Sequence, residues 1–404
     1  MPLPGCTATP AVVGNAVYVG DWDGFMHAID RNDGSTLWST ELSKTAIDAS
    51  PLVHEGSVYV GDGSGDFHAL DAATGSLRWT VELDDHPSTH IYSSAAAVDD
   101  LVFIGVAGVE LVQTKDDYTF RGRLVALDAN SGEERWRVYM TEDDATSGAG
   151  VSVWSSVAID RERGWVFVGT GNTYEEPASP RSDALVAVDY TTGEVQWVRQ
   201  FTEGDVYTIF QAAPQGPDAD VGAAPNLFRA AGRDLIGVGD KAGVYSVLDR
   251  ETGETVWARM LTPGAHLGGI MTSAAVAEGV IYVNSNHFTE PIGADSLDDP
   301  IEANTNTTFA LDAGSGDVIW SVEDPYPSVG GISYAGGVIF HSSVDGTVHA
   351  KDAASGEELW SQLYGDSMAS GTAIVAGTVY VTYGFYFFLS SGDVDGGLVA
   401  LSPP

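Results

Sequence analysis

The chain has 404 residues, of which 57 are acidic and 18 basic, so its formal net charge at pH 7 is −39. Such a surface repels the phosphates of nucleic acids and of anionic lipids, which excludes both as partners. A disordered acidic chain is excluded too, because 44% of the residues are hydrophobic and 10 are tryptophans. We therefore expect an acidic, halophilic surface on a folded protein, since molar salt shortens the screening length and suppresses self-repulsion.

Cysteine content and hydropathy limit the chemistry further. Cys6 is the only cysteine, so an intrachain disulfide and a cysteine-based zinc site are both excluded. Any metal is expected to be bound by oxygen or imidazole ligands. No apolar run approaches the roughly 18 residues of a membrane span, and the opening Met1–Cys6 has no room for a signal peptide.

From residue 28 onward one pattern recurs seven times, with the frame Ala-x-Asp-x-x-x-Gly-x-x-x-Trp. The copies are AIDRNDGSTLW (28–38), ALDAATGSLRW (69–79), ALDANSGEERW (126–136), AVDYTTGEVQW (187–197), VLDRETGETVW (247–257), ALDAGSGDVIW (310–320) and AKDAASGEELW (350–360). Each reads as a hairpin in which a strand ends at the Asp, the Gly permits a tight turn, and a second strand carries the Trp. An eighth copy begins at LVALSPP (398–404).

Two further short strands precede most copies, as in TPAVV and AVYVG before the first. Four antiparallel strands a unit is typical of a propeller blade. The sequence therefore predicts an all-β fold, an eight-bladed β-propeller of four-stranded blades that forms a single domain over residues 1–404. The seven tryptophans are interpreted as packing between adjacent blades. Whether residues 1–8 complete the last blade stays open.

Function is expected where copies depart from the repeat. The spacing between frames is about 40 residues at both ends of the chain but 57 to 63 residues in the middle, so insertions gather in blades three to six. After the second strand most blades have Gly-Asp-x-x-Gly. Blades three, four and five instead place Glu110, Asn172 and Lys241 there, and Trp154 lies outside the repeated frame, on the predicted first strand of blade four.

These four side chains together suit a planar anionic ligand beside a hard cation. Carboxylate and amide oxygens bind Ca²⁺, an ammonium attracts carboxylate or quinone oxygens, and an indole stacks on an aromatic ring. Each residue also fits an ordinary role when taken alone: Glu110 as a solvated loop acid, Asn172 as a turn residue, Lys241 on the surface and Trp154 in the core. Their shared placement favours a site.

At these residues the chain resembles the PQQ-dependent alcohol dehydrogenases, which are eight-bladed quinoproteins. Within that family, its sequence pattern most resembles that of the polyvinyl-alcohol dehydrogenases. The segment WSSVAIDRERGWVFVGTGN (154–172) matches the family's run from an inner-strand Trp to a Gly-Thr-Gly-Asn corner. The resemblance implies that Trp154 stacks under PQQ and that Asn172 and Glu110 bind Ca²⁺ as well as the cofactor. It further implies that Lys241 contacts the quinone oxygens.

Two departures from the family pattern concern catalysis. The family's adjacent cysteine pair is absent, since Cys6 stands alone. The catalytic His-Asp-x-Trp-Asp segment appears as GDVYT (204–208), with Thr208 where the usual general base is an Asp. A hydroxyl does not accept a substrate proton near neutral pH, so Asp205 is the candidate catalytic residue, either as the base or as a neighbour of the metal. The loop DADVGAAPNL (218–227) is assigned to the lining of the pocket.

The resemblance implies oxidation of a small or polymeric alcohol by hydride transfer to PQQ with Ca²⁺. A separate electron acceptor is required, because no haem-attachment motif is present. Relatives work outside the cytoplasm, so an extracytoplasmic location is expected, although this chain shows no signal peptide. The alternative is a non-catalytic propeller that serves as a protein-interaction scaffold. A carbohydrate- or polymer-binding propeller, tested at the aromatic run 384–389, is a third reading.

Overall fold

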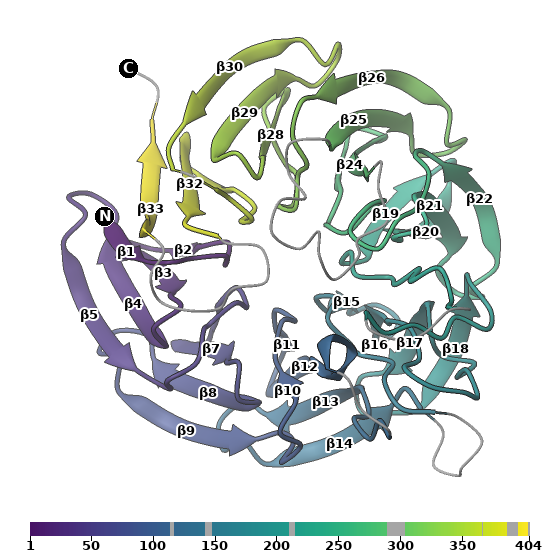
Figure 1. Cartoon of the computed structure of the whole chain (residues 1–404). Coiled ribbons are helices and arrows are strands. Elements are labelled where there is room, and N and C mark those ends of the chain that lie inside the picture. The colour runs from purple at the N-terminus through teal and green to yellow at the C-terminus, as the bar shows by residue number, and fades with distance from the viewer. Residues whose placement is uncertain are drawn as a thin grey trace.

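The computed structural model describes residues 1–113, 117–141, 148–209, 215–288, 304–365, 367–385 and 395–402. Their strands form eight antiparallel sheets arranged in a ring (Figure 1). The predicted eight-bladed propeller is thereby confirmed. Within these ranges the only helical element is the 3-10 turn η1 (Glu110–Val112), so the described residues hold no helix that could cross a membrane.

The first four blades follow one another along the chain. Blade one contains β2 (Ala11–Val13), β3 (Ala16–Gly20), β4 (Phe25–Asp30) and β5 (Thr36–Glu41), and blade two β6 (Leu52–His54), β7 (Ser57–Gly61), β8 (Asp66–Asp71) and β9 (Leu77–Glu82). Blade three contains β11 (Ala96–Val98), β12 (Leu101–Gly108), β13 (Arg123–Asp128) and β14 (Glu134–Tyr139), with β10 (Thr89–His90) added to β12, and blade four β15 (Ala158–Asp160), β16 (Trp165–Gly169), β17 (Ala184–Asp189) and β18 (Val195–Gln200).

The remaining blades close the ring. Blade five contains β19 (Asn226–Ala230), β20 (Arg233–Gly239), β21 (Val244–Asp249) and β22 (Thr255–Met260), and blade six β23 (Ala275–Ala277), β24 (Val280–His287), β25 (Thr305–Asp312) and β26 (Val318–Asp324). Blade seven contains β27 (Ser333–Ala335), β28 (Val338–Ser342), β29 (Thr347–Asp352) and β30 (Glu358–Leu363), and blade eight β31 (Ala373–Val375), β32 (Thr378–Tyr383), β33 (Asp395–Leu401) and β1 (Pro2–Pro4).

Strand β1 answers the open question about blade eight. It pairs antiparallel with β33, with Leu3 opposite Gly396, and so supplies the outermost strand of the last sheet. The main chains of Met1 and Leu398 exchange two hydrogen bonds of 2.8 and 2.9 Å. The two ends of the chain therefore share one blade, and residues from the start of the chain complete the last sheet of the ring.

The repeated Trp and Gly form one contact between adjacent blades. The indole of Trp38 donates to Ala72 O of blade two (3.0 Å), and a Cβ added to Gly75 would lie 2.5 Å from the same indole. Gly75 also has a φ of +71°, so only glycine suits both the turn and the indole above it. The same indole-to-carbonyl bond recurs for Trp79, Trp136, Trp197, Trp257 and Trp320. The predicted packing role of the tryptophans is confirmed for these six.

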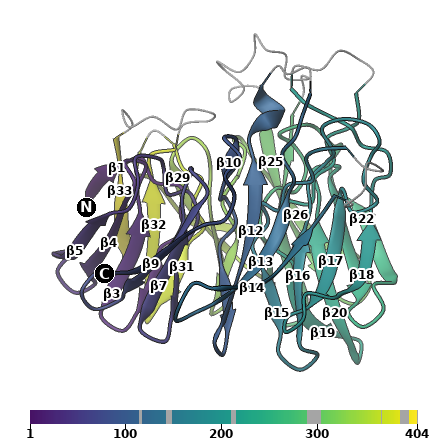
Figure 2. The same ribbon diagram turned by 90° about the horizontal axis from the view of Figure 1, so that it is seen from below.

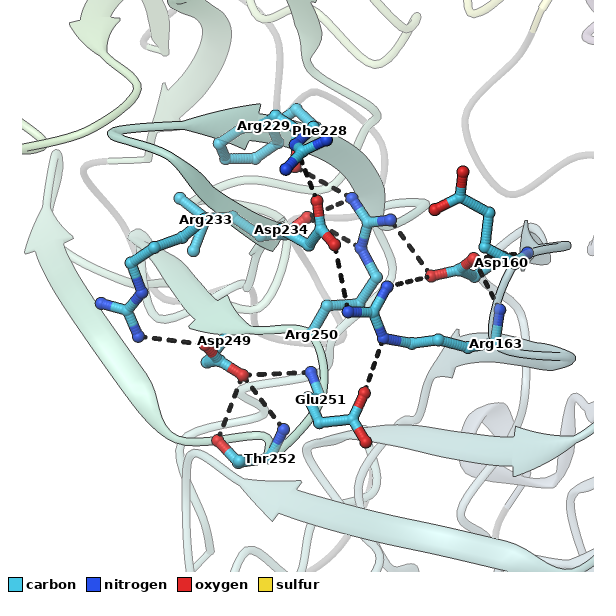
Figure 3. A network of polar contacts seen from close by, with 12 residues as sticks. Asp160, Arg163, Phe228, Arg229, Arg233, Asp234, Asp249, Arg250, Glu251 and Thr252 are labelled. Carbon is cyan, nitrogen blue, oxygen red and sulfur yellow. Dashed lines mark hydrogen bonds and ion pairs between the residues drawn. The ribbon is translucent and has the colours of Figure 1, made fainter.

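An ion-pair network joins blades four and five at the end where β15 and β16 meet (Figure 3). The buried guanidinium of Arg250 donates to Asp160 Oδ2 (3.1 Å) and to two backbone carbonyls. Arg163 extends the network to Asp234 (3.1 Å) and Glu251 (2.8 Å). Burial raises the pKa of Asp160. The hydrogen bonds from Arg250 and Arg163 lower it by a larger amount, so the net pKa is below the ordinary value. The carboxylate therefore stays charged and ties the two blades together.

Candidate functional site

The structure brings the sequence-predicted residues of blades three to five to one end of their sheets. Glu110, Asn172 and Lys241 follow β12, β16 and β20, the second strands of their blades. Figure 2 shows η1, which contains Glu110, at the upper end of β12. The prediction that the three share one structural position is wrong in register, because β12 runs on to Gly108 to pair with β10 and places Glu110 further along the chain.

The corner Thr170-Gly171-Asn172 is held by bonds to three other segments. Thr170 Oγ1 donates to Arg181 O (2.6 Å), and the Asn172 backbone N–H donates to Asp220 Oδ1 (2.6 Å). The side-chain amide of Asn172 donates to the carbonyls of Thr173 and Tyr207, both at 2.7 Å. Since both N–H groups of this buried amide are used, its oxygen is the atom left to accept a ligand.

Lys241 is buried against two carboxylates from the acidic loop. Its Nζ lies 3.1 Å from both oxygens of Asp218 and 2.8 Å from Asp220 Oδ2. Burial by itself would lower the pKa of Lys241, but the two carboxylates raise it above its ordinary value. Because Asp220 bonds both Asn172 and Lys241, it joins the predicted residues of blades four and five directly. Of the residues 218–227 assigned to the site lining, Asp218 and Asp220 make these contacts, whereas Asn226 and Leu227 begin strand β19.

Trp154 lies beneath the ammonium of Lys241, with Nζ 5.6 Å from the ring centroid. The prediction placed Trp154 on the first strand of blade four, but β15 begins only at Ala158. The indole also lines an axial cavity of about 480 Å³ to which all eight blades contribute residues. A Cβ added to Gly222 would lie 1.7 Å from the Trp154 ring, so backbone packs closely against the indole and holds its orientation. Trp154 thus separates the axial cavity from the polar groups around Lys241.

Glu110 is fully buried beside this group. Its Oε2 accepts the backbone N–H groups of Thr119 (3.0 Å) and Phe120 (2.8 Å), and its Oε1 lies 3.2 Å from His86 Nε2. The connection to the other residues runs through Tyr174, whose hydroxyl donates to Gly108 O (2.9 Å). Burial raises the pKa of Tyr174, and the charges of Asp220 and Glu110 raise it further. Tyr174 therefore lies within the electrostatic reach of both carboxylates.

Asp205 joins the same group from the segment 204–208. Its carboxylate is buried and accepts the backbone N–H groups of Asp218 (3.3 Å) and Ala219 (2.7 Å). Burial raises the pKa of Asp205 to about 6, although the amide of Ala219 opposes that change. Thr208, in the usual position of the base, is buried and accepts a hydrogen bond from the Tyr118 hydroxyl (3.4 Å). Asp205 is therefore the residue of this segment whose carboxyl has a pKa close to neutral pH.

Sequence reasoning missed Asp183, which is fully buried next to the site. Neither of its oxygens has a hydrogen-bond partner, and the neighbouring Ser182 hydroxyl donates to Ser179 O instead. Burial, and then the charges of Asp205 and Asp220, raise the pKa of Asp183 well above its ordinary value. A signal did exist: Asp183, at φ +49°, stands directly before the third strand, where blades one, two, five and seven place a glycine.

Two aromatic residues of the site were also missed. Tyr207 stacks on His266 with ring centroids 4.4 Å apart and an interplanar angle of 17°. His266 Nδ1 lies 3.6 Å from Asp218 Oδ2, so the pair extends the network around Lys241. No periodicity marks either residue, because both lie in connections between blades.

The chain is similar in sequence to a propeller family and to several alcohol dehydrogenases. A family model described as "Outer membrane protein assembly factor BamB" matches residues 2–220, 120–284 and 240–404. A polyvinylalcohol dehydrogenase of a Pseudomonas species is 32% identical over 355 residues, covering 75% of this chain and 54% of the relative. A quinohemoprotein alcohol dehydrogenase of Comamonas testosteroni is 25% identical over 487 residues, covering 94% of this chain and 66% of that protein.

Among solved structures, quinohemoprotein alcohol dehydrogenase ADHIIG from Pseudomonas putida HK5 aligns with a TM-score of 0.78 at 23% identity. The alignment covers 94% of this chain and 70% of that one. At this identity the likeness shows the shared fold. The chain spans about half the length of the polyvinylalcohol dehydrogenases it matches.

Proposed function

Because the chain belongs to the propeller family described as outer membrane protein assembly factor BamB, and its homologues include polyvinylalcohol and quinohemoprotein alcohol dehydrogenases, we propose that it is a quinoprotein oxidoreductase. The proposed reaction is oxidation of an alcohol by hydride transfer to PQQ, with Ca²⁺ bound beside the quinone. The substrate class is a small or polymeric alcohol, and a separate acceptor takes up the electrons. As in the sequence-based expectation, the location is extracytoplasmic.

The observation that carries this proposal is the excess of buried negative charge around Lys241. Asp218 and Asp220 pair with its ammonium, and two further buried carboxyls, Asp183 and Asp205, lie within electrostatic reach of Asp220. A buried carboxyl without partners is unfavourable whether charged or neutral, and neither oxygen of Asp183 has a hydrogen-bond partner. A divalent cation would offset the excess.

The donor set fits a hard cation. Glu110 and Asn172 offer a carboxylate and an amide oxygen, which are ligand types that Ca²⁺ prefers. The cysteine thiol is excluded from the site, since Cys6 is buried in the core of blades one and eight. We assign Glu110 and Asn172 as metal ligands and as residues that contact the cofactor.

The flat face and the ammonium fit a planar anionic ligand. Trp154 offers an indole held in place by the backbone of Gly222, and aromatic rings favour stacked or edge contacts with another ring. Lys241 stays charged because two carboxylates hold it so, and its ammonium can donate hydrogen bonds to quinone or carboxylate oxygens. We assign both residues to cofactor binding. Bound PQQ would supply the two-electron acceptor for the alcohol carbon.

Asp205 is assigned as the general base that takes the hydroxyl proton. With a pKa of about 6, the Asp205 carboxyl is ionised in most molecules at neutral pH and is still basic enough to accept a proton. The amides of Asp218 and Ala219 orient the carboxylate. The buried position of Asp205 keeps bulk water from competing for the proton.

The test is retention of quinone. PQQ and CaCl₂ are added to the full chain in high salt, the protein is desalted, and the quinone absorbance that elutes with it is measured. We expect stoichiometric retention by the wild type and at least tenfold weaker retention by Glu110→Gln and Asn172→Ala. The matched controls Glu133→Gln and Asn130→Ala make the same changes in the hairpin at the far end of blade three and should retain quinone as the wild type does.

A wild type that elutes without quinone would contradict the dehydrogenase proposal and favour the scaffold alternative. Retention that is unchanged in both site variants would remove Glu110 and Asn172 from the site. The aromatic run 384–389, on which a carbohydrate-binding alternative depends, extends outside the described residues from residue 386 onward. Its role stays a prediction.

A further inference from the structure

The seam between blades six and seven departs from the repeat at three buried positions at once. Where blades one to six have Val or Ile before the end of the second strand, blade seven has His341. Where the other frames have Ile, Leu or Val beside the frame Asp, blade seven has Lys351. Four residues after the frame Trp, blades one to five have Leu, Met or Phe, and blade six has Asp324. Three apolar core positions have become ionisable together, which the packing of a blade does not require.

The replaced residues meet in space. Asp324 ends β26 of blade six, and its Oδ1 pairs with the ammonium of Lys351 in β29 of blade seven. Its Oδ2 accepts a hydrogen bond from Thr308 Oγ1 (3.2 Å) and lies 3.8 Å from His341 Nε2. All three replaced residues are buried.

A second histidine completes the group. His349 lies directly opposite His341 in the β28–β29 register, and the two imidazoles stack with centroids 4.8 Å apart. The nitrogens of His349 contact Ser343 Oγ (3.1 Å) and Glu358 Oε2 (3.2 Å). When one nitrogen of His349 exchanges its contact for a metal ion, the contact of the other nitrogen orients the ring. In blades one and two the equivalent histidines, His27 and His68, instead pair with the Asp of their own turn.

His341 shows that the protein's own groups leave this cluster incomplete. Its side chain has no solvent exposure, yet neither ring nitrogen has a hydrogen-bond partner. A buried imidazole without partners is unfavourable unless something else in the site binds it.

The geometry points to a transition-metal site of the Zn²⁺ class between blades six and seven, with one ligand atom each from Asp324, His341 and His349. Their candidate ligand atoms all lie within 4.8 Å of one another. Two imidazoles and one carboxylate suit Zn²⁺ or Co²⁺ rather than Ca²⁺. Lys351 pairs with the other oxygen of Asp324 and leaves Oδ2 facing His341. The ion would tie the two blades together across their buried seam.

The test uses the full chain, freed of metal with a chelator and titrated with ZnCl₂ in excess CaCl₂, which occupies the surface carboxylates and the proposed quinone site. We expect one tight Zn²⁺ per chain in the wild type and at least a tenfold weaker affinity in His341→Val and His349→Gln. Val is the residue that blades one and two carry at the His341 position, so this variant keeps the packing of the repeat. CoCl₂ should give a visible ligand-field absorption in the wild type that both variants lose.

His68→Gln is the matched control, because it removes a buried histidine from the strand position of blade two that His349 occupies in blade seven. It should bind one Zn²⁺ with unchanged affinity. Equal Zn²⁺ binding by the wild type and His341→Val, or no Zn²⁺ bound by the wild type, would overturn the proposal and leave Lys351 as the cation of the seam. Quinone retention does not enter this test, so its result is independent of the proposed function.

Discussion

At the scale of single residues, one repeat position shows how a partner decides the charge of a buried acid. Asp62 follows the second strand of blade two and contacts His68 (3.1 Å). Burial raises the pKa of Asp62. Hydrogen bonds from His68 and two backbone amides lower it by a larger amount, so the net pKa is below the ordinary value. Asp240 is its counterpart in blade five, where Ser246 replaces the histidine. Without that partner, burial raises the pKa of Asp240 to about 7.

Asp240→Asn is expected to stabilise the protein at pH 8 and to leave it nearly unchanged at pH 4. A carboxyl whose pKa rises on folding contributes stability below its unfolded pKa, near 3.8, and loses that contribution as the pH rises through about 7. The amide lacks this titration and can still accept the Val244 N–H. The gain at pH 8 should be on the order of 4 kcal/mol, measured by chemical denaturation across the pH range.

Asp62→Asn in blade two is the control, with the opposite sign. The pKa of Asp62 is lowered on folding, so its contribution is present above pH 4 and lost as the pH falls. This variant should therefore be less stable than the wild type at neutral pH. If the stability of the two variants depended on pH in the same way, the explanation that His68 lowers the pKa of Asp62 would be refuted.

At the scale of the element, the repeated contact is a tryptophan of one blade on the hairpin glycine of the next. Trp360, the last copy, is the exception, because blade eight ends in β33 and β1 and offers no such hairpin. Its indole is 39% exposed, against 9% for Trp38. The outer strand β30 is exposed along its whole length for the same reason. A blade is therefore stabilised by its successor as much as by its own sequence.

Trp38→Ala should lower the free energy of unfolding by about 3 kcal/mol, because it empties the space over Gly75 and leaves Ala72 O without its donor. Trp360→Ala should change it by less than about 1 kcal/mol. Denaturant midpoints of the two variants, measured side by side, check the difference. Similar losses in both would mean that the indole stabilises its own blade rather than the contact with the next.

At the scale of the whole molecule, the charge of −39 sets the conditions under which the ring is stable. Like charges on a closed ring repel one another over distances comparable with the Debye length, which is roughly 10 Å at 0.1 M salt and about 3 Å at 1 M. Few exposed cations offset this repulsion, since several of the 18 basic residues lie in buried pairs such as Lys241 and Lys351. We therefore expect the fold to require screening by salt.

Dialysis from molar NaCl to low ionic strength is expected to unfold the protein, with the thermal midpoint rising as salt is restored. Circular dichroism followed during thermal melts at increasing NaCl measures this dependence. Sucrose at matched osmolarity, which strengthens burial without screening charge, should restore much less stability. Full stability in low salt would refute the halophilic interpretation.

The sequence by itself determined the repeating part of this protein. The frame Asp, Gly and Trp specify a local hairpin and a contact with the next blade, and both lie within about one repeat length along the chain. Local turn chemistry and nearest-neighbour packing are readable from such a pattern, so the blades, their number and the role of the tryptophans were predictable. Glu110, Trp154, Asn172, Lys241 and Asp205 stood out because each interrupts the repeat or matches a family motif.

Only the tertiary structure decided which carboxylates surround Lys241, that β1 closes blade eight, and that Asp324 meets Lys351 across a seam. Asp183 and Asp220 come within electrostatic reach of each other from separate connections, and the sequence carries no period from which such a meeting could be inferred. Connections of irregular length have no repeating pattern, so their path depends on the blades that they join. Their side chains acquire partners, and hence charge, only when the ring is closed.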